Sequence, residues 1–236
     1  MARSKVTSKF RNRLLAALSP ADLALLAPEL EAVTLDLRTP LEHPNKTVDA
    51  LYFIEHGIAS VVAVTKPQAK GEVGLIGCEG MSGLAVILGD NRSPHSIYMQ
   101  VGGDGQRIEA SAMRDALDRS ATLRAVVLRF AQSFMIQIAH TAVANSNAPV
   151  EQRLARWLLM AHDRVEGDDI HLTHEFLALM LGTRRPGVTE ALHALVQRGL
   201  IRTQRRTIVL VDRAGLERHA GRYYGIPEAE YDRMIG

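Results

Sequence analysis

The sequence predicts an α+β protein with an N-terminal β-sandwich, a long helix and a C-terminal helix-turn-helix that carries a wing. Three observations predict this fold. Residues 31–108 contain many short β-type runs separated by Gly, Pro, Asn and Asp. An apolar pattern with helical spacing follows, and residues 171–211 then read as helix, tight turn, helix and hairpin. We therefore expect three parts, at residues 1–120, 121–145 and 146–236.

Length and composition indicate an ordinary soluble protein with enough apolar residues for a core, since 47% of the 236 residues are hydrophobic and 23% are charged. No apolar run looks long enough to span a bilayer, and the first residues lack the apolar block of a signal peptide. We expect a cytoplasmic protein with no membrane partner. The single cysteine, Cys78, excludes an internal disulfide and any cluster held by several thiolates of one chain.

The N-terminal part begins with two short helices, at residues 10–18 and 20–30, where Ser19 is the expected N-cap and Pro20 takes the first helical position. The strands expected after them are VTLDL, ALYFIEHGIASVVAV, EVGLIG, LAVIL, HSIYMQV and QRIEA. We predict turns at Gly57 and at 102–105, because glycine clusters between β-type runs are typical of hairpins. Many short strands of this kind indicate a sandwich or barrel.

The long helix is predicted between residues 121 and about 144, after a short helix at 111–117. Its apolar stripe consists of Val127, Phe130, Phe134 and Ile138. One small sandwich looks too narrow to cover so broad an apolar surface, so the stripe predicts a symmetric dimer interface. The alternative is that the stripe is buried within one monomer. The polar segment 145–149 ends in proline and is the expected hinge between domains.

The helix-turn-helix is predicted from the capping residues of its two helices and from the glycine that ends the first one. Thr173 is a good N-cap for the first helix, and Gly182 ends that helix because glycine adopts positive φ at little cost. Thr183 or Arg184 then caps a second helix, whose first turn holds Pro186. The exposed face at the start of the second helix carries four candidate base-reading residues, Arg184, Arg185, Thr189 and Glu190.

Charge is concentrated in the same segment. Residues 172–213 hold seven arginines against three acidic residues, a net charge of +4, whereas the whole chain is only +2. A local basic excess of this kind is typical of a nucleic-acid-binding surface. Two β-type runs, 200–203 and 207–211, form a hairpin with a basic tip. The residues expected to contact the DNA backbone are Thr173, Thr183, Arg205 and Arg206. The alternative is a solvated helical hairpin with surface arginines.

Catalytic and metal sites are considered and set aside. His171 and His174 straddle a helix start instead of sharing one face, so they and the nearby His162, Asp168 and Asp169 do not predict a metal site. Ser82 lies in GMSGL, which lacks the nucleophile elbow of hydrolases. We predict no enzyme and no catalytic residue. An enzyme with an appended DNA-binding domain is the competing class.

Three motifs carry a family resemblance: FIEHGIASVV, GCEGMSGLAVILGDNRSP and LTHEFLALMLGTRRPGVTEALHALVQRGLI. In this order and at this length, the chain resembles the cyclic-AMP-receptor/FNR family of bacterial transcription regulators over nearly its whole extent. The resemblance implies a cyclic-nucleotide-binding-like jelly roll, a dimer through the long helix, and a second helix of the motif in the major groove at two half-sites. It also leaves RNA polymerase open as a partner.

The resemblance places Arg185 at the guanine-reading arginine of the family. Two other reading positions fall on Pro186 and Glu190, where the family usually has an acidic residue and an arginine. We therefore expect a DNA site that differs from the best-known one of the family.

The resemblance also implies a candidate ligand pocket at Met81, Ser82, Gly83, Arg92 and Ser93. Members that bind cyclic nucleotides usually carry a glutamate where this chain has Met81. Their phosphate-gripping Arg-Ser or Arg-Thr pair corresponds to Arg92 and Ser93, which stand one residue out of step and precede Pro94. A cyclic nucleotide is therefore disfavoured, and no cofactor is assigned. The FNR-type cluster is excluded by the cysteine count, and the histidines show no clear heme signature.

Together these features predict a homodimeric, sequence-specific regulator of transcription that binds a palindromic site. The alternative is a dimeric sensor that acts through a protein partner and binds DNA weakly or without sequence preference. No role is predicted for the tail at 213–236, and neither activation nor repression is assigned.

Overall fold

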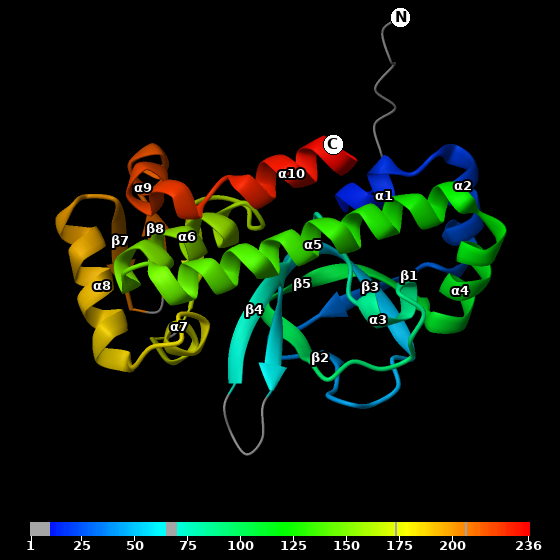
Figure 1. Ribbon diagram of the computed structural model, residues 1–236, viewed down its shortest axis with the longest axis horizontal. Helices are drawn as coiled ribbons and strands as arrows, with labels where there is room; N and C mark the ends of the chain where they lie inside the picture. Colours follow the sequence, from blue (N-terminus) through cyan, green and yellow to red (C-terminus); the bar gives the residue numbers. More distant parts are fainter. Residues whose placement is uncertain (1–9, 65–69, 173, 206) are drawn as a thin grey trace, which may run out of the picture.

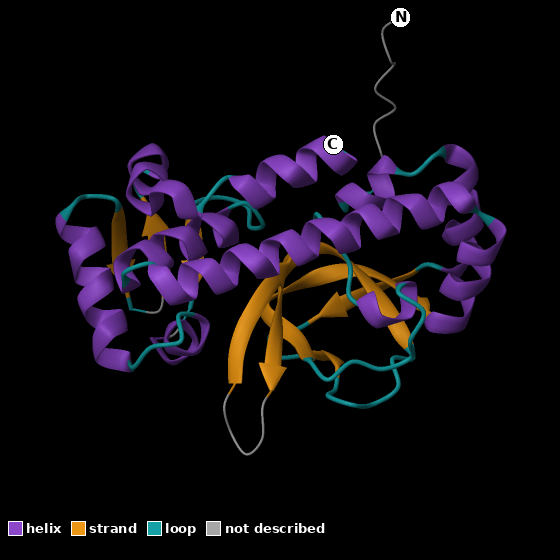
Figure 2. Ribbon diagram, in the orientation of Figure 1, coloured by secondary structure: helices purple, strands orange, loops and turns teal. Residues whose placement is uncertain are grey.

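A computed structural model describes residues 10–64, 70–172, 174–205 and 207–236 (Figure 1). An N-terminal sheet domain and a C-terminal helical domain lie at opposite ends of the molecule, and helix α5 (Ala121–Asn147) runs past both (Figure 2). This arrangement confirms the predicted order of sheet domain, long helix and helix-turn-helix domain.

The N-terminal domain contains an antiparallel sheet of five strands. They are β1 (Glu31–Leu35), β2 (Pro40–Glu42), β3 (Ala50–Val64), β4 (Lys70–Ile76) and β5 (Ser96–Glu109). The strand order is β1-β5-β3-β4, and β2 also pairs with β5. The predicted antiparallel character is therefore confirmed, although the strands are fewer and longer than expected.

The predicted turns at Gly57 and 102–105 are wrong. Both glycine groups lie inside the long paired strands β3 and β5, where the register shifts between Ile54 and Ala59. Gly57 has φ 91°, and a Cβ on Gly103 would lie 2.0 Å from the His56 carbonyl oxygen. These glycines therefore allow a bulge and a close approach of the two paired strands, which is the other common use of glycine within a sheet.

The predicted strand LAVIL is also wrong, because these residues form helix α3 (Leu84–Ile87). Gly83 precedes the helix with φ 85°, and Val86 and Ile87 are buried. A short apolar run does not distinguish a buried strand from a buried helical turn by its spacing.

The flanking helices agree better with the prediction. Asn12 caps α1 (Arg13–Ala17), and the Ser19 hydroxyl caps α2 (Pro20–Leu26) by accepting the Asp22 N–H at 3.1 Å. A 3₁₀ turn (Ala27–Glu29) follows α2, and α4 (Ala110–Arg119) leads from β5 into α5.

The predicted dimer stripe on α5 is packed against its own chain. Val127, Phe130 and Phe134 are at most 4% exposed, and Ile138 packs on the same core cluster as Phe134. The stripe is thus covered within the chain, contrary to the predicted interface, because the sheet and the helices α1 and α10 pack on it together. Polar contacts complete this face: the Gln137 side chain accepts the Leu75 N–H at 2.7 Å and donates to the Leu75 carbonyl at 3.2 Å.

By length and composition α5 is apolar enough to cross a membrane, contrary to the sequence expectation. Its packing accounts for that composition, since one face is buried against the sheet. The helix also extends to Asn147, so the predicted hinge shrinks to Ala148 and Pro149 before α6 (Val150–His162) begins.

The C-terminal domain continues with β6 (Asp169–His171), α7 (His174–Met180), α8 (Arg185–Gln197), β7 (Ile201–Gln204) and β8 (Thr207–Leu210). The strands form a small sheet in the order β6-β8-β7. Strand β6 was not predicted, because Asp169 and the preceding Asp168 look like part of a turn.

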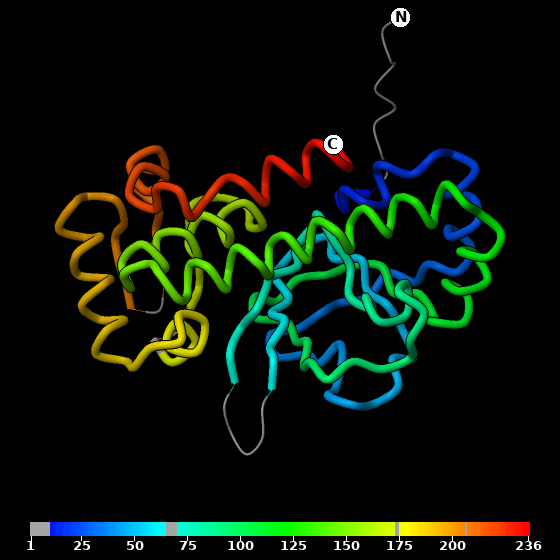
Figure 3. Tube along the Cα trace, in the orientation of Figure 1, coloured from blue at the N-terminus to red at the C-terminus, as the bar shows by residue number. Residues whose placement is uncertain are grey.

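The tail forms α9 (Arg213–Ala220), a 3₁₀ turn (Gly221–Tyr223) and α10 (Ile226–Ile235). Helix α10 returns along α5 toward the N-terminal domain, so the C-terminus lies near α1 (Figure 3). The tail thus begins on one domain and ends on the other.

Candidate DNA interface

Helices α7 and α8 meet at a tight turn, as predicted. Gly182 has φ 56°, which ends the first helix. The apolar sides of the two helices face one core, in which Leu177, Val188 and Leu195 are fully buried. This packing leaves the opposite side of α8 exposed.

Arg184 and Arg185 at the N-terminal end of α8 and Glu190 in its second turn are exposed to solvent. Arg184 is the N-cap residue, but its side chain makes no capping hydrogen bond. The Thr189 hydroxyl donates to the Arg185 carbonyl oxygen at 3.2 Å within the helix. Three predicted base-reading residues are therefore exposed, while the hydroxyl of the fourth is engaged locally.

Glu175 is the residue that the sequence reading missed. It lies in the first turn of α7, and its carboxylate pairs with the Arg185 guanidinium. Both side chains are more than half exposed. An exposed pair of this kind contributes only about 0–1 kcal/mol, so it can orient Arg185 and still release it to a stronger partner. A helix-turn-helix with an acid at this position and an arginine after the turn is the signal that could have indicated the pair.

The wing is the hairpin of β7 and β8. Arg205 lies exposed at its tip with φ 52°, and Arg202 is exposed on β7. Arg206 and Thr173, two predicted backbone contacts, lie outside the described residues. The third, Thr183, is half-buried, and its hydroxyl lies 3.0 Å from where a Cβ on Gly187 would stand, so its side chain packs on the first turn of α8.

The electrostatics of this face favour an anion. The N-terminal end of a helix carries a partial positive charge and unpaired N–H groups, and Arg184 and Arg185 stand at that end of α8. The face combines planar guanidinium groups, which suit guanine and phosphate, with an exposed arginine on the wing.

The predicted ligand-pocket residues do not form one open site. Met81 and Ser82 are completely buried, and the Ser82 hydroxyl accepts the Tyr52 N–H at 3.1 Å. Arg92 is exposed to solvent. The Ser93 carbonyl accepts the Asn45 N–H at 2.7 Å. These contacts occupy groups that a bound nucleotide would use.

A buried carboxylate nevertheless lies beside this loop. Glu42 is 4% exposed, accepts the Gly83 N–H at 2.6 Å, and has its pKa raised by burial. Its burial could not be predicted from the sequence, because a single acid in a short strand usually faces solvent.

Residues suggested as metal ligands contact one another instead. His162 lies 3.0 Å from Asp168, and an Arg213 nitrogen lies 2.7 Å from the other ring nitrogen of His162. Within the described part of the chain, no group of three His, Cys, Asp or Glu residues is arranged to hold a metal ion.

The reader domain, residues 150–220, docks directly on the sheet domain. Trp157 donates its indole N–H to Glu72 at 2.7 Å, and Ser60 donates to the same carboxylate at 2.6 Å. Burial raises the pKa of Glu72 to about 7 against the lowering effect of these bonds and of Arg156 and Arg164. The rings of Tyr98 and Phe176 add an aromatic contact between the domains.

Comparisons with known proteins agree with this geometry. Residues 152–219 match the family of Crp-like helix-turn-helix domains. None of the curated proteins matches the chain.

Solved structures match over most of the chain. A crp/fnr-family regulator from Eubacterium rectale is 18% identical with a TM-score of 0.68, covering 88% of this chain and 97% of its own. A CRP-family regulator from Thermus thermophilus is 22% identical with a TM-score of 0.66, covering 80% and 96%. The c-di-GMP responsive global regulator of Xanthomonas campestris is 15% identical with a TM-score of 0.64, covering 81% and 99%. The chain therefore has a Crp-like helix-turn-helix domain within a Crp/Fnr-like fold.

Proposed function

We propose that the chain is a homodimeric, sequence-specific regulator of transcription in the cytoplasm, which places α8 in the major groove of a palindromic DNA site. The observation that carries the proposal is the exposed N-terminal turn of α8, where Arg184 and Arg185 stand beside a wing with an arginine at its tip. A Crp-like helix-turn-helix domain supports the same assignment. We assign no enzymatic activity.

Dimerisation is supported by the outer face of α5, which differs from the stripe predicted from the sequence. Residues at alternating steps of three and four along this face are all exposed: Ala121, Ala125, Leu128, Gln132, Met135, Ala139, Ala142 and Ser146. Small and apolar residues at this 3.5-residue period are typical of a coiled-coil seam. Leu128 and Met135 are 40% and 51% exposed, so a second copy of the helix would cover them.

A two-fold axis along this seam would place two copies of α8 on one side of the dimer. Two symmetric readers recognise two half-sites whose centres lie about one helical turn, roughly 34 Å, apart. The proposal therefore predicts an inverted repeat.

The DNA-reading role is tested by three arginine variants measured by fluorescence anisotropy. Arg185→Ala should cost about 1–3 kcal/mol on the preferred duplex and relax the choice of base at one position per half-site. Arg205→Ala should weaken preferred and scrambled duplexes alike and flatten the salt dependence, because a wing arginine contacts phosphate. Arg198→Ala, at the far end of α8, is the matched control and should change neither property.

An unchanged base preference in Arg185→Ala would contradict the assigned reading role. Rising salt could instead weaken binding of the unmodified protein to preferred and scrambled duplexes equally. The function would then be that of a sensor acting through a protein partner.

For the sheet domain we propose only that cyclic nucleotides are not its ligand. Met81 has no carboxylate for a ribose hydroxyl, and the Ser93 carbonyl and hydroxyl already accept N–H groups of the loop. We expect cyclic AMP and cyclic GMP to bind weakly or not at all, and micromolar binding that Arg92→Ala abolishes would contradict this expectation.

A further inference from the structure

The ion pair between Arg185 and Glu175 joins the first turns of the two helices of the motif. Glu175 lies in the first turn of α7, and Arg185 is the first residue of α8. The tight turn at Gly182 packs the two helices together, and Leu177 and Val188 are fully buried on their inner sides. The core of the motif therefore brings these two charged side chains together, although they are ten residues apart in the sequence.

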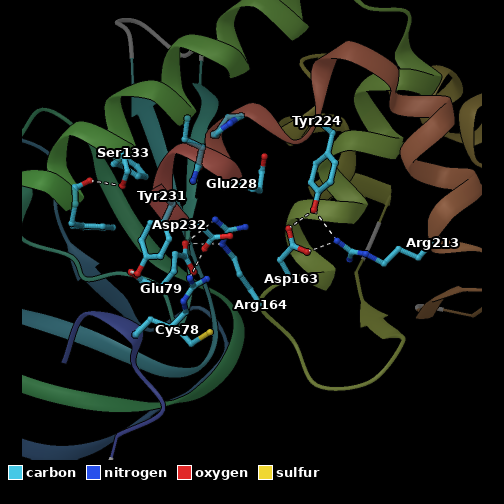
Figure 4. A pocket seen from close by; sticks show the side chains of 15 residues that line it. Cys78, Glu79, Ser133, Asp163, Arg164, Arg213, Tyr224, Glu228, Tyr231 and Asp232 are labelled. Atoms are coloured by element: carbon cyan, nitrogen blue, oxygen red, sulfur yellow. Dashed lines mark hydrogen bonds and ion pairs between the residues drawn. The ribbon is translucent and has the colours of Figure 1, made fainter. Parts of the chain in front are cut away.

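This pair differs from an ion pair that lies inside the folded chain. Arg164 and Glu79 line a cavity together with residues of α10 (Figure 4), and their side chains are at most 14% exposed. The side chains of Arg185 and Glu175 are 61% and 69% exposed. An exposed ion pair contributes little to the stability of a fold. Both members of the Arg185 pair are instead accessible to an external partner.

The Arg185 guanidinium can hold Glu175 and contact a base at the same time. A guanidinium has more N–H donors than one carboxylate oxygen uses. Within the described part of the chain, Arg185 donates from Nη2 to Glu175, and its side chain forms no other hydrogen bond. Nη2 keeps a second N–H, which can be donated to guanine together with an N–H of Nη1 or Nε. The ion pair is therefore compatible with the guanine contact of the proposed function.

The Glu175 carboxylate also has an acceptor that the chain does not use. Arg185 donates to Oε1, and across residues 10–64, 70–172, 174–205 and 207–236 no hydrogen bond or ion pair involves Oε2. The first helix of a helix-turn-helix crosses the DNA backbone, where phosphate repels an acid. Glu175 contacts Arg185 instead, so the proposed function places its carboxylate next to the base that Arg185 reads.

The chemistry of the major groove specifies what this carboxylate can bind there. The N–H donors that bases present in the major groove are cytosine N4 and adenine N6. The base opposite the guanine that Arg185 reads is cytosine. Its N4 bonds to guanine O6 within the base pair, so these two atoms lie about 3 Å apart. The other N–H of N4 points into the groove, beside a guanidinium that contacts O6.

We propose that Glu175 is a specificity-determining residue, which accepts a hydrogen bond from N4 of the cytosine paired with the guanine that Arg185 contacts. The two residues then read both bases of one G·C pair, one residue from each helix of the motif. A hydrogen bond to an ionised acceptor is stronger than one between neutral groups, which suits it to discriminate between bases. This inference rests on the proposed function and adds a base contact from α7.

The test uses the duplex that the full chain selects, with one modified base. The position is the G·C pair at which Arg185→Ala relaxes the choice of base. N4-methylcytosine replaces the N–H that points into the groove and keeps the base pair, whereas 5-methylcytosine adds a methyl group and leaves that N–H in place. Fluorescence anisotropy gives the ratio of the dissociation constants for the modified and unmodified duplexes. A general effect of protein charge cancels in this ratio.

For the unmodified chain we expect N4-methylcytosine to weaken binding by about tenfold, and 5-methylcytosine by less than about twofold, because only the first removes a donor to a charged acceptor. In Glu175→Ala the N4-methyl group should no longer weaken binding, since the acceptor is absent. Glu217→Ala removes the acid of another exposed ion pair, on α9, and is the matched control. It should keep the tenfold effect.

Equal binding of the unmodified chain to the cytosine and N4-methylcytosine duplexes would overturn the proposal. Glu175 would then be a residue that only orients Arg185. An effect of N4-methylcytosine that persists in Glu175→Ala and is lost in Glu190→Ala would assign the contact to Glu190, which is exposed on α8, and would also overturn it. Selection of no sequence at all would contradict the proposed function and this inference together, so the two failures are distinguishable.

Discussion

The two faces of α5 both carry apolar residues, but they lie in different environments. Phe130 and Phe134 on the inner face are almost completely buried against the sheet, whereas Leu128 and Met135 on the outer face are about half exposed. The inner face also carries Gln137, whose amide hydrogen-bonds the backbone of edge strand β4. The periodicity of the sequence does not distinguish the two faces, but their burial does. One face packs within the chain, and we propose that the other forms the interface between two chains.

The largest effect is expected from charges on the outer face. The double variant Leu128→Asp, Met135→Asp would place four carboxylates along the seam of a dimer, and each unpaired buried charge costs about 3–5 kcal/mol. We expect a folded monomer by sedimentation and circular dichroism, with palindrome binding lost. Arg129→Asp, exposed but off the seam, is the control. A double variant that stays dimeric would place the interface elsewhere.

Substitution on the inner face should instead destabilise the fold. Phe134→Ala should lower the free energy of unfolding by about 3–5 kcal/mol, because it leaves a cavity against the sheet. Urea denaturation measures this loss. Phe134→Asp, a natural choice if the stripe joined two chains, should unfold the protein and not merely separate a dimer. A stable, monomeric Phe134→Asp variant would reverse our assignment of the two faces.

The contact between sheet and reader domains should depend on pH through Glu72. Its pKa in the folded protein is about 7, above the ordinary value of 4.5, so the folded state holds the proton more tightly. The contribution of Glu72 to the free energy of unfolding is fully present below about pH 4.5 and is lost as pH rises to about 7. The change is up to about 3 kcal/mol.

The measurement is the free energy of unfolding of Glu72→Gln and the unmodified chain across pH 4.5–7. The variant should lose this part of the pH dependence, while Glu29→Gln on the surface should keep it. Parallel curves for Glu72→Gln and the unmodified chain would show that the carboxylate does not titrate in this range.

A smaller effect is expected from the polar residue of the inner face. Gln137→Leu would leave the N–H and C=O of Leu75 without their partners, which should cost about 1–3 kcal/mol in the free energy of unfolding. Gln132→Leu on the outer face is the matched substitution and should leave unfolding of the monomer nearly unchanged. An equal loss of unfolding free energy at both positions would contradict the assignment of one face to the interior of the chain and the other to its surface.

Local chemistry explains which features could be predicted from the sequence. Ser19 acts through its hydroxyl on an N–H three residues along the chain, and Gly182 acts through its own backbone, so their roles as cap and helix stop were predictable. Gly57 and Gly103 were interpreted wrongly because each makes room for the backbone of a paired strand that is distant in the sequence.

The same limit applies to the candidate sites. The Arg184 and Arg185 positions followed from the helix start, but Glu72 and Glu175 have partners that only the folded chain brings next to them. The sequence correctly predicted an apolar stripe on α5. It did not predict that the stripe packs within its own chain, because periodicity does not specify what covers a face.

The most direct test of the central claim, that two readers joined along α5 act as a unit, is selection of bound sequences from a random duplex pool with the full chain. The claim predicts enrichment of an inverted repeat whose half-site centres are about 10–10.5 base pairs apart. Enrichment of a single unrepeated element, or of no sequence at all, would contradict it.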